Sequence, residues 1–203
     1  MKRLILSIFT MLAVIPAAFA DDGGAWINIQ LNKGWEKTYA FARLEHRSNN
    51  NFGSTEAMFA AVGYGYKFAP WFKADLSYEY WDINPQINFH KAVLTGTGTM
   101  ARDGLAVSIR EKLELAVNPA NSATSLTLRT RLRAQYNIPE SIFRPYAMAE
   151  VFTSSSAWVR SLNYLGTEMV FDKHNSVDLF YLYHLPNGGQ PVHVLGVGYY
   201  FSF

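Results

Sequence analysis

The sequence predicts an all-β protein that folds as a transmembrane antiparallel up-and-down β-barrel. Three observations lead to this prediction: an N-terminal export segment, long segments in which apolar and polar residues alternate, and a C-terminal segment that ends on phenylalanine. Alternation with a period of two is typical of strands with one apolar and one polar face. No segment has a clear helical periodicity of 3.6 residues.

Residues 1–20 have the order of a secretory signal peptide. Lys2 and Arg3 precede an apolar stretch over residues 4–16, and Ala18-Phe19-Ala20 forms a small-residue cleavage site. The apolar stretch is shorter than the ~20 residues that a membrane-spanning helix needs. We therefore expect a Sec-type signal peptide over residues 1–20 and a single barrel domain over residues 21–203.

The charge balance argues against a nucleic-acid partner. The chain has 18 basic and 16 acidic residues, and the signal segment removes two basic residues and no acidic one. The remaining chain has no basic excess, whereas nucleic-acid-binding domains normally carry one. Cysteine is absent, which excludes disulfides and thiolate metal sites. The histidines show no metal-ligand spacing, so we expect no metal and no cofactor.

The alternating segments predict ten strands after residue 36. The segment over residues 72–81 is the clearest, because Leu76, Tyr78 and their neighbours at even positions are apolar or small while Asp75 and Glu79 alternate with them. The segments exceed the ~5–6 residues of ordinary strands and reach the ~9–11 that cross a bilayer. The predicted strands span residues 37–48, 55–68, 71–82, 88–100, 104–117, 125–137, 144–153, 160–171, 175–185 and 191–203.

Residues 25–32 also alternate and predict an eleventh strand. Single-chain bacterial barrels usually have even strand numbers. We therefore expect ten strands with an additional N-terminal strand that is short, partial or inside the barrel, and twelve strands as the alternative.

The connections and the aromatic residues indicate the outer membrane. Short turns alternate with longer polar loops, and aromatic residues gather near the strand ends, as in outer-membrane barrels. The chain ends in an aromatic pattern at Tyr199, Phe201 and Phe203, which is similar to the signal that the barrel assembly machinery recognises. The expected partners are thus outer-membrane lipid and that machinery.

The chain resembles the domain-of-unknown-function family 2490, a group of small outer-membrane barrel proteins. The resemblance covers most of the chain after the signal segment and implies a barrel but no activity. It is carried by Trp26, Leu44-Glu45-His46-Arg47, Arg110-Glu111-Lys112, Leu128-Arg129-Thr130-Arg131, Pro145-Tyr146 and Glu150-Val151-Phe152.

The polar faces of the strands place many charges in the predicted lumen. Unpaired buried charges are costly, so acidic and basic side chains should interleave. Two interpretations remain open: a salt-bridge network that fills a narrow lumen, or a basic track for small anionic solutes. Ten or twelve strands lie between the packed eight-stranded barrels and the wide porins, so any path would be narrow. The candidate residues are Arg43, Glu45, Arg47, Lys73, Asp75, Glu79, Arg110, Lys112, Glu114, Arg129, Arg131, Arg133 and Glu150.

Two further features are weighed against this interpretation. His174 and Ser176 have the His-x-Ser spacing of outer-membrane lipid hydrolases, in which histidine acts as the base for serine. The asparagine that usually follows is Val177 here, and His174 is expected at a short turn, so we expect no enzyme and keep a lipid hydrolase as the alternative. Glu111 falls on the apolar face, which a β-bulge or a position near the membrane interface would explain.

Overall fold

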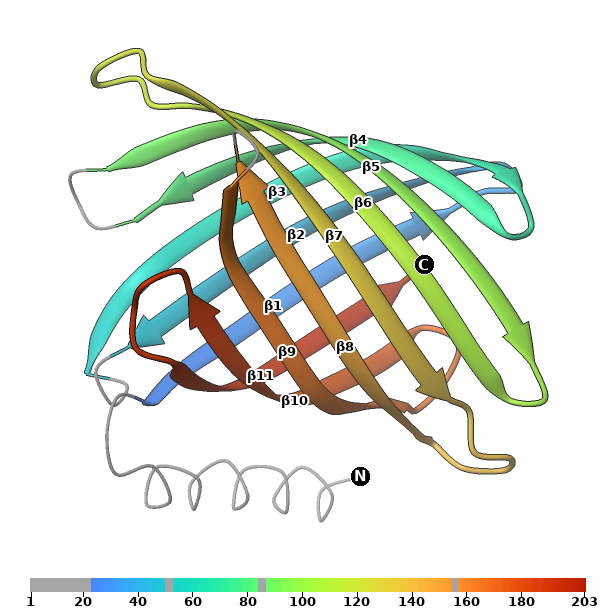
Figure 1. The fold of residues 1–203 in the computed structure, drawn as a ribbon. Coiled ribbons are helices and arrows are strands. Elements are labelled where there is room, and N and C mark those ends of the chain that lie inside the picture. The colour runs from blue at the N-terminus through green and yellow to red at the C-terminus, as the bar shows by residue number, and fades with distance from the viewer. Residues whose placement is uncertain (1–22, 50–52, 84–86, 155–156) are drawn as a thin grey trace.

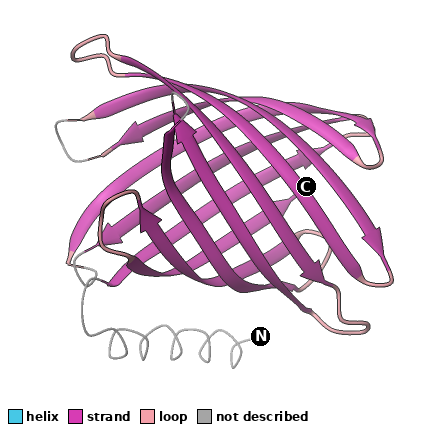
Figure 2. Cartoon of the chain, in the orientation of Figure 1, coloured by secondary structure: helices cyan, strands magenta, loops and turns pink. Residues whose placement is uncertain are grey.

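The chain forms a closed eleven-stranded β-barrel (Figure 1). The computed structural model describes residues 23–49, 53–83, 87–154 and 157–203, so the predicted signal peptide lies outside the described residues. All regular structure in this part of the chain is strand (Figure 2). Among these residues no helix has the length and apolar character needed to cross a membrane.

The strands agree with the alternating segments of the sequence to within three residues at each end. They are β1 (Gly23–Gly34), β2 (Thr38–Asn49), β3 (Ser54–Ala69), β4 (Phe72–Asp82), β5 (Asn88–Arg102), β6 (Leu105–Val117), β7 (Thr124–Tyr136), β8 (Phe143–Ser154), β9 (Ala157–Val170), β10 (Asn175–Pro186) and β11 (Val192–Ser202). The prediction of an all-β barrel is confirmed.

The predicted strand number and the fully antiparallel topology are wrong. β1 has 12 residues and is a complete strand of the wall, neither a short addition nor a segment inside the barrel. It pairs antiparallel with β2 and parallel with β11, where Ile27 faces Val197 and Gln30 faces Tyr200. The parallel pair lets an odd number of strands close, and it places the start of β1 and the end of β11 at opposite ends of the barrel.

The two ends of the barrel differ, and we name them by their connections. Short connections such as those between β3 and β4 and between β5 and β6 lie at the turn end, together with the C-terminus. Longer connections such as the one between β6 and β7 lie at the loop end, together with the start of β1.

The outer surface of the barrel is apolar around its circumference. Leu44, Leu76 and Leu165, which belong to three different strands, are 63%, 61% and 64% exposed. Alternate residues of the same strands, such as Glu79 and Leu162, are buried inside. The strands therefore expose mainly apolar side chains on the outer surface and enclose both charged and apolar side chains.

Four aromatic side chains on the inner face lie opposite glycines of the neighbouring strand. The cross-strand pairs are Phe41 with Gly63, Tyr39 with Gly65, Tyr146 with Gly166, and Phe180 with Gly196. A Cβ atom on each of these glycines would collide with the facing ring. Glycine thus lets each ring lie along the wall, as aromatic residues do when they cover glycine in a sheet.

We predict that Gly196→Val prevents normal closure of the barrel, because the added side chain would occupy the position of the Phe180 ring. The urea midpoint of unfolding and the yield of refolded barrel should both fall. Gly96→Val is the matched control, because a Cβ there makes only ordinary contact with Phe72. Equal urea midpoints for the two variants would contradict this account of the aromatic–glycine pairs.

Candidate functional site: the charged lumen

The loop-end half of the lumen is filled by apolar side chains. One buried cluster joins Trp26 and Phe152 to aliphatic and aromatic residues of β8–β11, and a second joins Phe59 and Trp81 with small residues of β3. The rings of Phe59 and Trp81 stack with their centroids 4.2 Å apart. These side chains narrow this half of the lumen, and a second cavity of about 110 Å³ remains beside them, with Trp26, Arg47 and Trp81 in its wall.

Arg47 joins the two apolar clusters. Its guanidinium carbon lies 3.8 Å from the ring centroid of Trp26 and 4.8 Å from that of Trp81. Its Nε donates to Glu45 Oε1 at 2.7 Å, so the charge is both paired and held between ring faces. Arginine suits this position because its flat guanidinium stacks on aromatic rings.

Three buried carboxylates cross the middle of the lumen, and each is bound by two basic side chains. Glu79, Glu114 and Glu150 are 1%, 3% and 2% exposed. The bases reach them from different strands, which ties the sides of the barrel together. The ion pairs are Arg43–Glu79 and Lys112–Glu79 at 3.4 Å, Lys91–Glu114 at 3.2 Å, Arg129–Glu114 at 2.5 Å, Arg110–Glu150 at 2.6 Å and Arg129–Glu150 at 3.0 Å.

Arg129 and Arg131 differ in pairing, although both belong to the inner face of β7. Arg129 donates to both Glu114 and Glu150. Arg131 lies directly between Arg110 and Glu150 in the register of β6, β7 and β8. Glu150 is occupied by Arg110 and Arg129, and Arg131 makes no ion pair with any described residue. Arg131 therefore lies between an arginine and a carboxylate that is already ion-paired, and like charges directly opposite each other are unfavourable.

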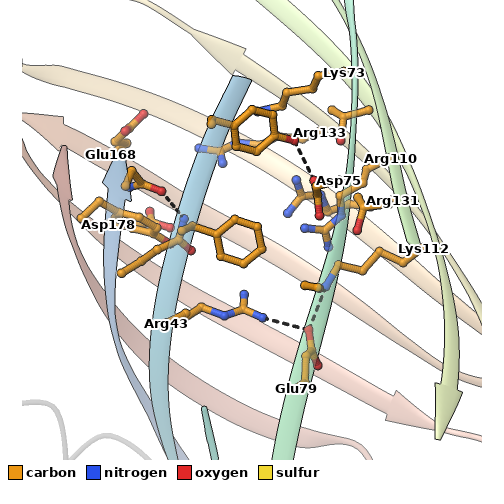
Figure 3. Close-up of a pocket in the computed structure, with 18 residues that line it drawn as sticks. Arg43, Lys73, Asp75, Glu79, Arg110, Lys112, Arg131, Arg133, Glu168 and Asp178 are labelled. Atoms are coloured by element: carbon orange, nitrogen blue, oxygen red, sulfur yellow. Dashed lines mark hydrogen bonds and ion pairs between the residues drawn. The ribbon is translucent and has the colours of Figure 1, made fainter. Parts of the chain in front are cut away.

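A cavity of about 320 Å³ occupies the turn-end half of the lumen (Figure 3). Its wall includes Tyr39 and Lys73, each the second residue of its strand, so the cavity reaches the turn end of the barrel. Hydroxyl and amide side chains such as Thr95 and Gln30 complete the wall. Its charged residues are six basic and four acidic: Arg43, Lys73, Arg110, Lys112, Arg131, Arg133, Asp75, Glu79, Glu168 and Asp178.

The carboxylates of the cavity that make no ion pair accept hydrogen bonds from neutral groups. Tyr39 Oη donates to Asp75 at 2.8 Å, and Tyr146 Oη donates to Asp178 at 3.0 Å. Gln135 Nε2 donates to Glu168 at 3.4 Å. These carboxylates therefore share the cavity with basic side chains to which, among the described residues, they form no direct ion pair.

The structure places every charged residue singled out in the sequence on the walls of the cavities or in the ion-pair network. Two further contributors were not singled out in the sequence: Lys91 and Arg160. Lys91 binds Glu114, and the guanidinium of Arg160 lies 4.2 Å from the ring centroid of Phe152. Their positions on the polar face of an alternating strand were the signal that could have included them.

Glu111 lies on the outer face at the middle of β6 and accepts a hydrogen bond of 2.8 Å from Thr130 Oγ1 on β7. The pairing of β6 with both neighbours is continuous at this residue, which excludes the β-bulge as one of the two explanations for Glu111. The hydroxyl of Thr130, directly opposite in register, partly satisfies the carboxylate where apolar neighbours surround it.

His174 lies in the turn between β9 and β10, next to the C-terminus. Its Nδ1 is 2.5 Å from the carbonyl oxygen of Ser202, and its backbone N–H donates to Asp172. Hydrogen bonds from Asn175 and from the His174 backbone lower the pKa of the Asp172 carboxyl. Tyr199 Oη also donates to Asn175, so this turn is tied to β11, the strand that carries Tyr199, Phe201 and Phe203.

The chain belongs to the family described as "Protein of unknown function (DUF2490)", whose sequence profile matches residues 23–192. The match extends from β1 into the start of β11 and confirms the family that the sequence resembles. No curated protein matches the chain.

We predict that substitutions of two arginines of β7 differ in their effect on the free energy of unfolding. Arg129→Met should lower the free energy of unfolding by about 3–5 kcal/mol, because it leaves Glu114 and Glu150 short of a buried partner. Arg131→Met should leave it unchanged or raise it, because it removes a cation with no ion pair. Urea unfolding followed by tryptophan fluorescence measures both, and an equal loss would contradict the difference in pairing.

Proposed function

We propose that the chain is an outer-membrane β-barrel whose lumen is closed, so that it does not form an open pore. The observation that carries this proposal is a crowded lumen, in which apolar clusters and buried ion pairs leave small cavities of about 320 and 110 Å³. Moving from the loop end, a solute would meet packed apolar clusters and then the network of Glu79, Glu114 and Glu150.

The outer surface supports a membrane location. Strands of 11–16 residues are long enough to cross a bilayer, and their outward apolar side chains are exposed on every side. Exposed aromatic residues gather at the turn end, where they would form an interfacial girdle: Trp35, Phe68, Trp71, Tyr136 and Phe143. The short turns would then face the periplasm, together with the C-terminal Phe203.

The interior supports a closed barrel rather than a basic track. The arginine row of β7 does not line a continuous path, because Arg129 is bound on both sides by carboxylates and also lies 4.3 Å from the ring centroid of Phe152. Eleven strands make a barrel only slightly wider than the eight-stranded ones whose interiors are filled by side chains. The long inward side chains occupy much of the additional width and leave the cavities described above.

The membrane location is tested by fractionation and by heat modifiability. The protein should sediment with outer membranes, resist extraction by sodium carbonate, and migrate faster on SDS gels when unboiled, because a closed barrel stays folded in detergent. Recovery in the soluble periplasmic fraction would overturn the membrane proposal.

The closed lumen is tested by electrical recording in planar bilayers. The wild-type protein should show no conductance steps, whereas Trp26→Ala/Trp81→Ala should conduct, because it removes both rings that hold Arg47. Conductance of this variant should favour anions, since the lumen has a basic excess. Trp71→Ala is the control, because Trp71 is exposed outside the barrel. Anion-selective steps in the wild type would show a pore instead.

A further inference from the structure

Three basic side chains of the turn-end cavity have no ion pair with a described residue. Arg131 makes none because Glu150, the carboxylate opposite it, is bound by Arg110 and Arg129. Its Nε is buried without a hydrogen-bond partner among the described residues. Arg133 lies with its guanidinium carbon 4.0 Å from the ring centroid of Tyr146. The Nζ of Lys73 is 5.1 Å from the ring centroid of Tyr39. Aromatic faces position the last two without neutralising them.

We propose that this cavity is a binding site for a small anionic solute, held by Lys73, Arg131 and Arg133. The cavity wall carries six basic and four acidic residues, and Arg110 is already paired with Glu150 outside the wall, so the remaining basic excess favours an anion. Guanidinium groups suit phosphate and carboxylate because they present parallel N–H donors. The ligand would enter at the turn end, because the apolar clusters close the other side.

The other polar residues of the cavity wall indicate which groups the anionic ligand has besides its charge. Thr95, Thr97, Gln30 and Asn32 offer hydroxyl and amide groups around the basic residues. Asp75 accepts hydrogen bonds but cannot donate them when ionised, so it suits a ligand with hydroxyl groups. A volume of about 320 Å³ is at the lower end of small-molecule sites. We infer a hydroxylated phosphate or dicarboxylate of the size of a sugar phosphate.

The aromatic–glycine pairs keep this space open. Tyr39 and Phe41 both line the cavity, and their rings lie over Gly65 and Gly63. A larger residue on β3 would push these rings into the cavity. The pairs therefore serve both the closure of the wall and the volume of the site.

Isothermal titration calorimetry of the refolded barrel in neutral detergent tests the site, with glucose 1-phosphate and inorganic phosphate as anionic probes and glucose as the neutral one. The anions should bind and glucose should not. Arg131→Met and Lys73→Met should each weaken binding at least ten-fold, which is about 1.4 kcal/mol. Raising the salt concentration should also weaken binding, because charged groups carry it.

The control is Arg102→Met, which removes one arginine that is 92% exposed at a turn and bound only to Asp103. It should bind the anions as the wild type does. Heat modifiability confirms that each variant is folded, and Arg131→Lys replaces Arg131→Met if the latter does not refold. Absence of anion binding by the wild type, or equal binding by all variants, would overturn the site.

The site does not depend on the closed lumen or on the membrane location. A conducting wild type that still loses phosphate binding in Arg131→Met would contradict the proposed function and support the site. A non-conducting barrel that binds no anion would support the closed lumen and contradict the anion site. The proposed orientation supplies only the compartment, the periplasm, from which the solute would come.

Discussion

The interaction on which the structure most depends is the binding of Glu150 by Arg110 and Arg129. Closing a sheet around its polar faces removes the charged residues from water, and each must find a partner inside. Glu150, on β8, meets one arginine from β6 and one from β7, and Arg129 extends the chain of ion pairs to Glu114. These pairs hold three adjacent strands in one register. They also determine which basic side chains are left without an ion pair, because both oxygens of Glu150 are already bound, one by Arg110 and one by Arg129.

The lumen is consequently asymmetric along the barrel axis. Toward the loop end, Arg47 is enclosed by rings and the apolar clusters pack as a core. Toward the turn end, aromatic rings that could have filled the space lie flat on glycine, and a charged cavity remains. The same residue types therefore produce a packed half and an open half. A glycine opposite a ring does not by itself separate the two halves, because Tyr146 and Phe180 also lie opposite glycines and contribute to an apolar cluster.

Much of this fold could be predicted from the sequence, because a period of two identifies both the strand and its two faces. The strand limits and the inward position of the β7 arginines follow from that pattern alone. Closure could not be predicted in the same way, since the parallel pairing of β1 with β11 depends on how the ends of the sheet meet. Nor could Arg129 be separated from Arg131 in the sequence, where both alternate with apolar or small residues. Their difference comes from the register with β6 and β8 and from side chains that reach diagonally to Glu114 and Glu150.

The position of Arg131 separates a purely structural lumen from one with a ligand. A buried cation without a partner is unfavourable, and an apolar side chain of similar volume is often neutral or stabilising in its place. A barrel that needed only to be filled would be served by methionine or leucine at this position. Arg131 instead adds a half-buried charge without an ion pair to a wall that already has a basic excess, in the same cavity as Lys73 and Arg133. An anion from outside the chain would supply what the neighbouring carboxylates do not, and its binding would convert an unfavourable electrostatic arrangement into a satisfied one.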